Sequence, residues 1–428
     1  MKDITVQKVK KLKGEIIIPG DKSISHRAIM LGSLAKGKTK IKGFLHSEDC
    51  LNTMGCFRDM GINFDIKDKD IVVEGKGLFG LQAPAKQIYA GNSGTTIRLI
   101  IGILSAQKFV SSITGDETLC RRPMDRVMIP LKQMGSCIEA AQGRYAPLKI
   151  TGSNLKAICY ELPVASAQVK SSILLAGLYA QGKTEVIEKV QTRDHTERMM
   201  QSFGVDIKKI NDTITLEHTE DLKAREIEVP GDISSAAFFI VAGLITPNSH
   251  IVIKNVGMNP TRNKVIDVLV SMGGNINIIN KRSYGQEPVA DLEVRHSVLK
   301  GIKIGGDVIA NIIDEIPVLC VAASFAQGIT EISNAKELRV KESDRIKTMV
   351  EALLSVGVDI KEKEDGMIIH GAEIIRGGKI KTYYDHRVAM ALSIAGLNSQ
   401  DGIFIDDIDC VATSFPNFYE LIKKLKVF

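Results

Sequence analysis

The chain has 428 residues, of which 44% are apolar, 25% charged and 5% aromatic, and its formal net charge is +6. One hydrophobic core rarely serves a chain of this length, so we expect two domains. The mild positive charge, with no basic tail and few aromatic side chains, argues against nucleic-acid binding and suits small anionic ligands. Residues 1–14 lack the apolar core of a signal peptide, and no segment approaches the ~20 apolar residues that span a bilayer. We therefore predict no membrane partner and a cytoplasmic location.

The seven cysteines are odd in number and contain no C-x-x-C pair, which indicates free thiols. The sequence contains no H-E-x-x-H or Cys/His metal-ligand spacing, and no G-x-G-x-x-G or Walker A segment. These observations predict a protein without a metal and without a cofactor.

A unit of helix, strand, second helix and paired strands recurs six times along the chain. The first helix of each unit is apolar on nearly every side, which is typical of a buried helix. These first helices are predicted over residues 22–37, 93–107, 166–182, 232–246, 314–328 and 385–399, and the strands that follow them over 38–44, 110–116, 183–190, 250–256, 330–335 and 402–408.

In the first five units the second helix closes on a glycine that precedes alternating strand residues. A helix C-terminus that turns into a strand needs a left-handed φ, which glycine adopts without a steric penalty. The sixth second helix is predicted within 415–428, at the end of the chain. The five glycines are Gly61, Gly135, Gly204, Gly273 and Gly357.

The sequence P-G-D occurs at 19–21 and 230–232, each time between an extended apolar stretch and a first helix. The two copies divide the chain into two halves of three units. We predict one domain over 20–228 and a second, discontinuous domain over 1–19 and 229–428, with hinges near the two turns. The strand before Pro19 is expected to complete the second domain, whose sixth unit is short of strands. The predicted fold class is α/β, with three buried helices wrapped by sheets in each domain.

Basic side chains recur where a loop leads into a helix, and helix N-termini are natural anion-binding sites. Taken singly, each motif also fits a capped helix or a solvated charge. The segment 341–345 alone, for example, fits an exposed helical turn with internal ion pairs. Clusters at equivalent points of a repeat nevertheless favour one anion-binding cleft; they are Lys22 with Arg27, 120–126, 191–197, 338–345 and 385–387.

Carboxylates accompany these cations. Asp314 and Glu315 begin a buried helix, where an unpaired charge is costly, and Glu342 follows Lys341. A cationic site that also holds a few carboxylates predicts acid–base chemistry on an anionic substrate.

Eight segments, in order over essentially the whole chain, together resemble the 5-enolpyruvylshikimate-3-phosphate synthases and their class II branch. The segments are PGDKSISHRA (19–28), GNSGTTIRL (91–99), RRPMDRV (121–127), SAQVKSSILLAGL (166–178), RDHTE (193–197), DEIPVL (314–319), LRVKESDRI (338–346) and DHRVAMA (385–391). The resemblance implies an inside-out α/β barrel of three repeats in each domain, and closure of the domains over the substrates. It also implies transfer of the enolpyruvyl group of phosphoenolpyruvate to the 5-hydroxyl of shikimate 3-phosphate, with release of phosphate, in aromatic amino-acid biosynthesis.

The resemblance further implies roles for individual residues. Asp314 would accept the 5-hydroxyl proton, and Glu342 would donate a proton to the methylene carbon, with Lys22 as a third catalytic residue. The residues implied to bind shikimate 3-phosphate are Lys22, Ser23, Arg27, Ser166, Ala167, Gln168, Arg193, Asp314 and Lys341. Those implied to bind phosphoenolpyruvate are Lys22, Asn92, Gly94, Arg122, Gln168, Lys341, Arg345, His386 and Arg387.

Three positions depart from the pattern of the family. Thr413 stands where many members carry a lysine before Ser-Phe-Pro, which removes one phosphoenolpyruvate contact. Asp125 stands where the class II branch usually has glycine. Arg193 stands near the Ser or Tyr that other members use.

Two alternative functions are open at this point. UDP-N-acetylglucosamine enolpyruvyl transferases share the implied fold and use a reactive loop cysteine, and Cys120 lies in the comparable loop. That family, however, places its cysteine farther ahead of the Arg-Pro pair, in a glycine-rich loop. The second alternative is a nucleic-acid-binding repeat module, against which the low aromatic content and the carboxylates argue. We expect a monomer whose partners are only its small-molecule substrates.

Overall fold

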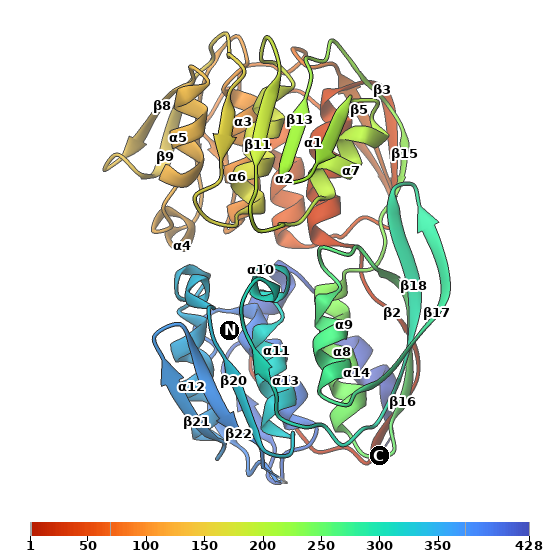
Figure 1. Cartoon of the computed structure of the whole chain (residues 1–428). Helices are drawn as coiled ribbons and strands as arrows, with labels where there is room; N and C mark the ends of the chain where they lie inside the picture. The colour runs from red at the N-terminus through yellow and green to blue at the C-terminus, as the bar shows by residue number, and fades with distance from the viewer. Residues whose placement is uncertain (1, 69, 373, 428) are drawn as a thin grey trace. The chain divides into compact units, whose positions relative to one another are not determined.

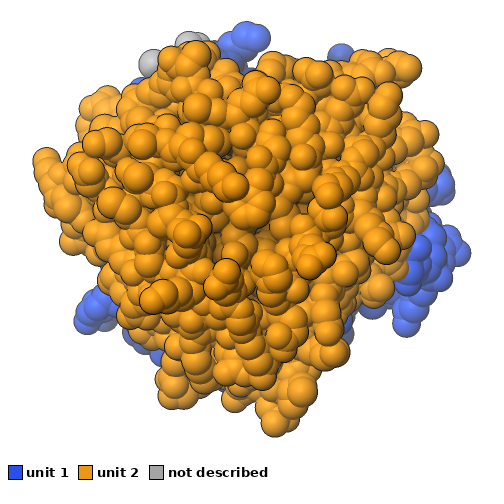
Figure 2. All heavy atoms as spheres, turned by 90° about the horizontal axis from the view of Figure 1, so that it is seen from above, with its two compact units in different colours: residues 1–19, 230–283, 287–428 blue, residues 20–229, 284–286 orange. Residues whose placement is uncertain are grey.

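The computed structural model describes residues 2–68, 70–372 and 374–427, and the chain forms two compact units, coloured separately in Figure 2. Unit 1 comprises residues 1–19, 230–283 and 287–428, and unit 2 comprises residues 20–229 and 284–286. The chain therefore passes from one unit to the other at the two P-G-D turns and at a short excursion near residue 285. Whether these turns act as hinges between separate domains stays a prediction.

Unit 2 is built around three buried helices, α1 (Lys22–Leu34), α3 (Gly94–Leu104) and α6 (Ala167–Gly177) (Figure 1). A second helix belongs to each repeat: α2 (Glu48–Asp59), α5 (Asp125–Gln133) and α7 (His195–Ser202), with a short α4 (Glu117–Cys120) before α5. The apolar residues of the unit form one core of their own.

Three sheets cover these helices, and each has the same pattern of pairing. The first two strands in each order below are parallel, and the pairs that follow are antiparallel; one further strand of the first sheet also pairs in parallel. The sheet orders are β14 (Leu222–Lys223), β3 (Ala35–Lys42), β5 (Asp70–Lys76) and β4 (Asn63–Lys67), with β15 (Glu226–Glu228) also on β3; β6 (Ile88–Tyr89), β7 (Val110–Thr114), β9 (Tyr145–Thr151) and β8 (Cys137–Ala141); and β10 (Cys159–Glu161), β11 (Thr184–Ile187), β13 (Thr213–Leu216) and β12 (Ile207–Ile210).

Unit 1 repeats this plan around α8 (Ile233–Ile245), α11 (Ile316–Ser324) and α13 (His386–Gly396). Its second helices are α9 (Lys264–Ser271), α12 (Arg345–Ser355) and α14 (Phe418–Leu425), and shorter helices are α10 (Val308–Ile312), η1 (Lys336–Val340) and η2 (Asp409–Thr413). The sheet orders are β17 (Asn275–Tyr284), β18 (Glu287–Arg295), β16 (His250–Gly257), β2 (Lys11–Ile17) and β25 (Lys426–Val427); β19 (Lys303–Ile304), β20 (Ile329–Ile332), β22 (Gly366–His370) and β21 (Asp359–Lys363); and β1 (Ile4–Val6), β24 (Ile403–Ile405) and β23 (Gly378–Ile380).

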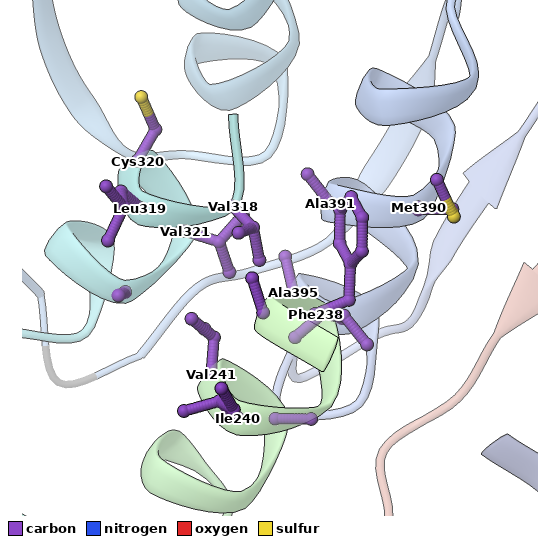
Figure 3. Packing of buried hydrophobic residues seen from close by; sticks show 14 of the residues in the cluster. Phe238, Ile240, Val241, Val318, Leu319, Cys320, Val321, Met390, Ala391 and Ala395 are labelled. Atoms are coloured by element: carbon purple, nitrogen blue, oxygen red, sulfur yellow. The ribbon is translucent and has the colours of Figure 1, made fainter. Parts of the chain in front are cut away.

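The three first helices of unit 1 pack their apolar side chains against one another. Figure 3 shows Val241 of α8, Val321 of α11 and Ala395 of α13 meeting in this core. All thirteen residues of α8 are buried, as expected for a helix that is apolar on every side. The α/β fold class and the buried first helices predicted from the sequence are confirmed.

The N-terminal strands complete unit 1. β1 pairs antiparallel with β24 of the sixth repeat, with Thr5 opposite Phe404, and β2 pairs in parallel with β16. This confirms the expectation that the segment before Pro19 supplies strands missing from the second half of the chain.

The five repeat glycines all have left-handed backbones. Their φ values run from +83° at Gly61 to +95° at Gly135, and each follows the last turn of a second helix. This confirms the helix-to-strand turn predicted at each position. No helix in the part of the chain that the structure describes is long and apolar enough to cross a membrane.

Candidate active site

In unit 2 the site begins at the N-terminus of α1. Asp21 caps this helix, because its carboxylate accepts a hydrogen bond from the Ile24 backbone at 2.9 Å. Lys22 and Ser23 follow as the first two helical residues, where backbone N–H groups remain available to an anion. The Lys22 Nζ atom donates to Oδ2 of Asp49 on α2 at 3.0 Å, and its side chain is 19% exposed.

Arg27 lies one turn farther along α1 and is almost completely buried. Its Nη1 atom donates to the Ser23 carbonyl at 2.9 Å. The Nε and Nη2 atoms donate to two hydroxyl oxygens, Oγ1 of Thr196 at 2.6 Å and Oγ of Ser171 at 2.9 Å. All three of these partners are neutral groups.

The other two first helices of unit 2 are capped by serine. The Ser93 hydroxyl accepts from the Thr96 backbone at 3.1 Å, and the Ser166 hydroxyl accepts from the Val169 backbone at 3.4 Å. The simple reading of these motifs, a capped helix, is therefore correct. It does not exclude anion binding, because a serine cap adds no negative charge to the positive end of the helix.

Two arginines crowd the start of α3. Arg98 donates to Oε1 of Gln168 at 2.9 Å, and Gln168 donates in turn to Oγ1 of Thr95 at 3.1 Å. A Cβ atom at Gly94 would lie 2.8 Å from Nη1 of Arg98 and 3.0 Å from Nη1 of Arg122. Glycine is therefore what lets both guanidinium groups approach this helix end. Arg98 was missed by our sequence analysis, although it lies one helical turn after Gly94.

His26 is buried near Lys22 and Arg27 and stays neutral. Burial, and then the charges of Lys22 and Arg27, hold the pKa of His26 well below its ordinary value. Its Nδ1 atom lies 2.6 Å from Oγ1 of Thr53, which lies 2.6 Å from Oγ1 of Thr96. This chain of hydrogen bonds ties α1 and α2 to the start of α3.

Unit 1 has the opposite electrostatics at the start of α13. Asp385 is fully buried and caps the helix by accepting from the Arg387 backbone at 2.9 Å. The Nε atom of Arg345 lies 2.8 Å from Oδ2 of Asp385. Burial by itself would raise the pKa of Asp385, but the charge and hydrogen bond of Arg345, together with the nearby His386, more than offset it, and the pKa is lowered.

Arg345 also contacts the two carboxylates predicted to act as base and acid. Its Nη2 atom donates to Oε2 of Glu342 at 2.6 Å, and its Nη1 atom donates to Oδ1 of Asp314 at 3.2 Å. Arg387 donates to the Asp314 carbonyl at 2.9 Å. Four predicted site residues thus form one network in unit 1. Arg345 is only 1% exposed and residues 341–344 are half-buried, so the segment is not an exposed turn, although it does contain the expected internal ion pair, Arg345 with Glu342.

A second buried network lies at the start of α8. Arg262 donates to Oδ1 of Asp232 at 3.2 Å and to Oγ of Ser234 at 2.5 Å. The Ser234 hydroxyl also hydrogen-bonds to Glu315, which is fully buried at the N-cap position of α11. Glu315 therefore has a polar partner on α8. Apart from its position after a strand, nothing in the sequence indicated that Arg262 belongs to a buried network.

The remaining predicted residues lie at helix starts and in loops. Asn92 donates to Oδ2 of Asp116 at 2.8 Å, and Asp125 pairs with Arg144 at 3.1 Å. Ala167 and His386 are the first residues of α6 and α13; Arg193 precedes α7, Lys341 follows η1, and Thr413 ends η2. Cys120 is half-buried and bonded to the Gly115 carbonyl, and all seven cysteines are free, as predicted.

Unit 2 thus presents the capped N-termini of its three buried helices with basic side chains beside them, and unit 1 presents an arginine–carboxylate network. Two α/β units of three repeats each are typical of the two-unit enolpyruvyl transferases. A family model for EPSP synthase (3-phosphoshikimate 1-carboxyvinyltransferase) matches residues 6–422. The chain belongs to this family and is an enzyme of its class.

Individual relatives agree over the full length. The chain is 51% identical to the 3-phosphoshikimate 1-carboxyvinyltransferase of Pelobacter propionicus, covering 100% of this chain and 99% of the relative. It is 51% identical to the enzyme of the same name from Bacillus cereus, covering 99% and 100%. The solved structure of EPSP synthase from Acinetobacter baumannii superimposes with a TM-score of 0.89 at 46% identity, covering 100% of this chain and 98% of that one.

Proposed function

We propose that this chain transfers the enolpyruvyl group of phosphoenolpyruvate to shikimate 3-phosphate with the residues named from its sequence. The observation that carries the proposal is Arg27 of α1, whose nearly buried guanidinium is held by the Ser23 carbonyl and by the hydroxyls of Ser171 and Thr196. A phosphate group suits an arginine fork. Lys22 and Ser23 at the start of α1 add a point charge and backbone N–H groups to the same anion.

The proposed shikimate 3-phosphate site takes in further residues of both units. In unit 2 the α6 start contributes Ser166, Ala167 and Gln168, whose amide is already oriented by Arg98 and Thr95. The loop before α7 adds Arg193. The unit 1 contributors are Asp314 and Lys341.

The proposed phosphoenolpyruvate site is likewise assembled from helix starts. Asn92, Gly94 and Arg122 belong to the α3 end, where two guanidinium groups lie close to the helix. Arg345, His386 and Arg387 would hold the carboxylate. Lys22, Gln168 and Lys341 would touch both substrates.

In the proposed mechanism Asp314 accepts the proton of the 5-hydroxyl of shikimate 3-phosphate. The hydroxyl oxygen at the same time forms a bond to C2 of phosphoenolpyruvate. Glu342 donates a proton to C3, and a tetrahedral intermediate results. Loss of a C3 proton then expels inorganic phosphate and leaves the enolpyruvyl ether. Arg345 contacts both carboxylates, which holds acid and base in a fixed relation within unit 1.

We also propose that units 2 and 1 correspond to separate domains over 20–228 and over 1–19 with 229–428, joined by hinges near the P-G-D turns. The chain passes between the units at Pro19–Gly20 and at Val229–Pro230, which supports these boundaries. A monomer in the cytoplasm, with no nucleic-acid or membrane partner, fits the mild net charge of +6 and the free cysteines.

The test is phosphate release from phosphoenolpyruvate by the purified protein, with shikimate 3-phosphate and, separately, with UDP-N-acetylglucosamine. We expect release only with shikimate 3-phosphate.

Glu342→Ala should lower kcat by about 100-fold or more, the range for loss of a general acid. Lys22→Met should weaken substrate binding by about 10- to 150-fold, the effect of one lost charge-assisted contact. Release only with the sugar nucleotide, or full kcat in Glu342→Ala, would contradict the proposal.

A further inference from the structure

Lys170 is a fully buried lysine on α6 that lies between two glutamates of the same unit. Its Nζ atom lies 2.9 Å from Oε2 of Glu188 and 2.6 Å from Oε1 of Glu197, and both glutamates are themselves buried. Burial by itself would lower the pKa of Lys170, but the two carboxylates more than offset it and raise the pKa, so the lysine stays charged. These three residues, the Lys170 cluster, hold one another firmly, because separating them would leave a buried charge without its partner.

The members of the Lys170 cluster come from three different places in the third repeat. Glu188 directly follows β11, Lys170 lies one turn after the Ser166 cap of α6, and Glu197 lies in the first turn of α7. Residues 188–194 connect β11 to α7 without forming a helix or a strand. The cluster therefore ties both ends of this connecting loop to the start of α6.

Glu188 also holds the loop at a point within it. Its Oε2 atom accepts from the backbone N–H of Thr192 at 3.1 Å and from the Thr192 hydroxyl at 2.8 Å, and Thr192 is buried. Arg193 is the next residue along the loop. Its backbone thus lies between Thr192, which Glu188 holds, and the first turn of α7, which Lys170 holds through Glu197.

We propose that the Lys170 cluster and Thr192 are positioning residues, which fix the backbone of Arg193 relative to the start of α6. This inference rests on the proposed function, in which Arg193 and residues 166–168 at the α6 start bind shikimate 3-phosphate. One buried charge cluster then sets the spacing between the two parts of the third repeat that hold this substrate. The cluster acts through the loop and the helix, not by touching the substrate.

The first test is Thr192→Val, which removes one hydroxyl from the loop and leaves every ion pair of the Lys170 cluster in place. We expect the KM and the calorimetric Kd for shikimate 3-phosphate to rise about tenfold, the equivalent of one lost contact to a charged group. kcat and the KM for phosphoenolpyruvate should change little, because Arg193 belongs only to the proposed shikimate 3-phosphate site and serves ground and transition states alike. Thr192→Ser keeps the hydroxyl and should keep the wild-type KM.

Thr184→Val is the matched control. Thr184 is a fully buried threonine of β11, the strand that leads into Glu188, and its hydroxyl has no hydrogen-bond partner among the residues that the structure describes. The same change of atoms there should leave the KM for shikimate 3-phosphate unchanged. An equal rise in Thr184→Val and Thr192→Val would reduce the effect to general packing and overturn the inference.

A double-mutant cycle shows whether the effect passes through Arg193. Arg193→Ala removes the side chain that the loop positions, and it should itself raise the Kd for shikimate 3-phosphate. Thr192→Val should then raise the Kd no further in the Arg193→Ala background, because nothing remains to be positioned. A further tenfold rise in that background would show that Thr192 acts elsewhere and would overturn the inference.

Lys170→Met tests the cation of the cluster, and we expect the Kd for shikimate 3-phosphate to rise at least as far as in Thr192→Val. The double variant Lys170→Met, Glu197→Gln serves where the single variant does not fold. It removes one cation and one anion together and leaves Glu188 paired with Lys209, whose Nζ atom lies 2.8 Å from its Oε1 atom. A folded variant of either kind with the wild-type Kd would overturn the role of Lys170.

The outcomes separate the two proposals. Wild-type protein that releases no phosphate with shikimate 3-phosphate would refute the proposed function and, with it, this inference. An active wild type whose Kd for shikimate 3-phosphate equals that of Thr192→Val would refute the positioning role alone.

Discussion

Two buried arginines, Arg27 within α1 of unit 2 and Arg345 at the start of α12 of unit 1, differ in the groups that they contact. Arg27 donates to two hydroxyls and a carbonyl, whereas Arg345 contacts Asp314, Glu342 and Asp385. Three carboxylates compensate the charge of Arg345 inside unit 1, which the two hydroxyls and the carbonyl that contact Arg27 do not do.

The helix caps differ in the same sense. Two of the three first helices of unit 2 begin at Ser93 and Ser166, while α8 and α13 of unit 1 begin at the buried carboxylates of Asp232 and Asp385. A buried carboxylate needs a cation, and arginine provides one in both places. In unit 2 the exception is α1, which begins at the carboxylate of Asp21. Lys22, His26 and Arg27 lie in the first two turns of this helix.

The largest expected effect is on stability, when each arginine is replaced by methionine. Arg345→Met leaves Asp385 buried without its cation and should lower the free energy of unfolding by about 3–5 kcal/mol. Arg27→Met removes the donors to the Ser171 and Thr196 hydroxyls and to the Ser23 carbonyl, at a cost of about 1–3 kcal/mol. Urea denaturation of the two variants measures the difference. Equal losses would mean that the charge environments of the two arginines are alike, against the structure.

A smaller difference between the units is expected in how their stability depends on pH. The pKa of His26 in unit 2 is lowered by burial and by Lys22 and Arg27, so the unfolded chain takes up this proton first as the pH falls. The free energy of unfolding that neutral His26 contributes above pH 6.5, the ordinary pKa of histidine, is therefore lost as the pH falls below 6.5. The loss is at most about 1.4 kcal/mol per pH unit. Asp385 in unit 1 has a lowered carboxyl pKa and loses its contribution only under more acidic conditions, below its ordinary value near 3.8.

The variant that checks this is His26→Asn, which keeps a polar group near the Thr53 hydroxyl but does not titrate. The free energy of unfolding between pH 6.5 and pH 5 should fall less steeply in the variant than in the wild type. Parallel curves would show that His26 is not the group responsible.

Local features of the sequence predicted most of the fold. The glycines at helix ends, the serine caps and the apolar first helices each depend on neighbours within a few residues, and each is confirmed. The missing strand of the sixth repeat could also be predicted, because counting repeats showed which half was incomplete. The implied substrate contacts stay proposals.

The residues that set the charge of the site could not be predicted in this way. Thr196 and Ser171 look like ordinary helix residues, and only the fold brings them to Arg27. The same holds for Arg345, whose partner Asp385 is 40 residues away and whose local pattern fits an exposed turn. A sequence motif shows which side chains are present. Burial and partners from other repeats determine the electrostatic environment of each side chain.

The smallest expected effect concerns a feature in which the two units should not differ. Gly204 of unit 2 and Gly357 of unit 1 end second helices with φ of +90° and +89°, and an added Cβ would meet nothing within 4 Å at Gly204 and only Arg376 at 3.5 Å at Gly357. Gly204→Ala and Gly357→Ala should therefore each cost about 1 kcal/mol, from backbone strain alone. Urea denaturation that gives equal losses would show that the repeat imposes one backbone on both units, so that their difference lies in the side chains around the helix starts. A much larger loss at one glycine would place part of the difference in the backbone itself.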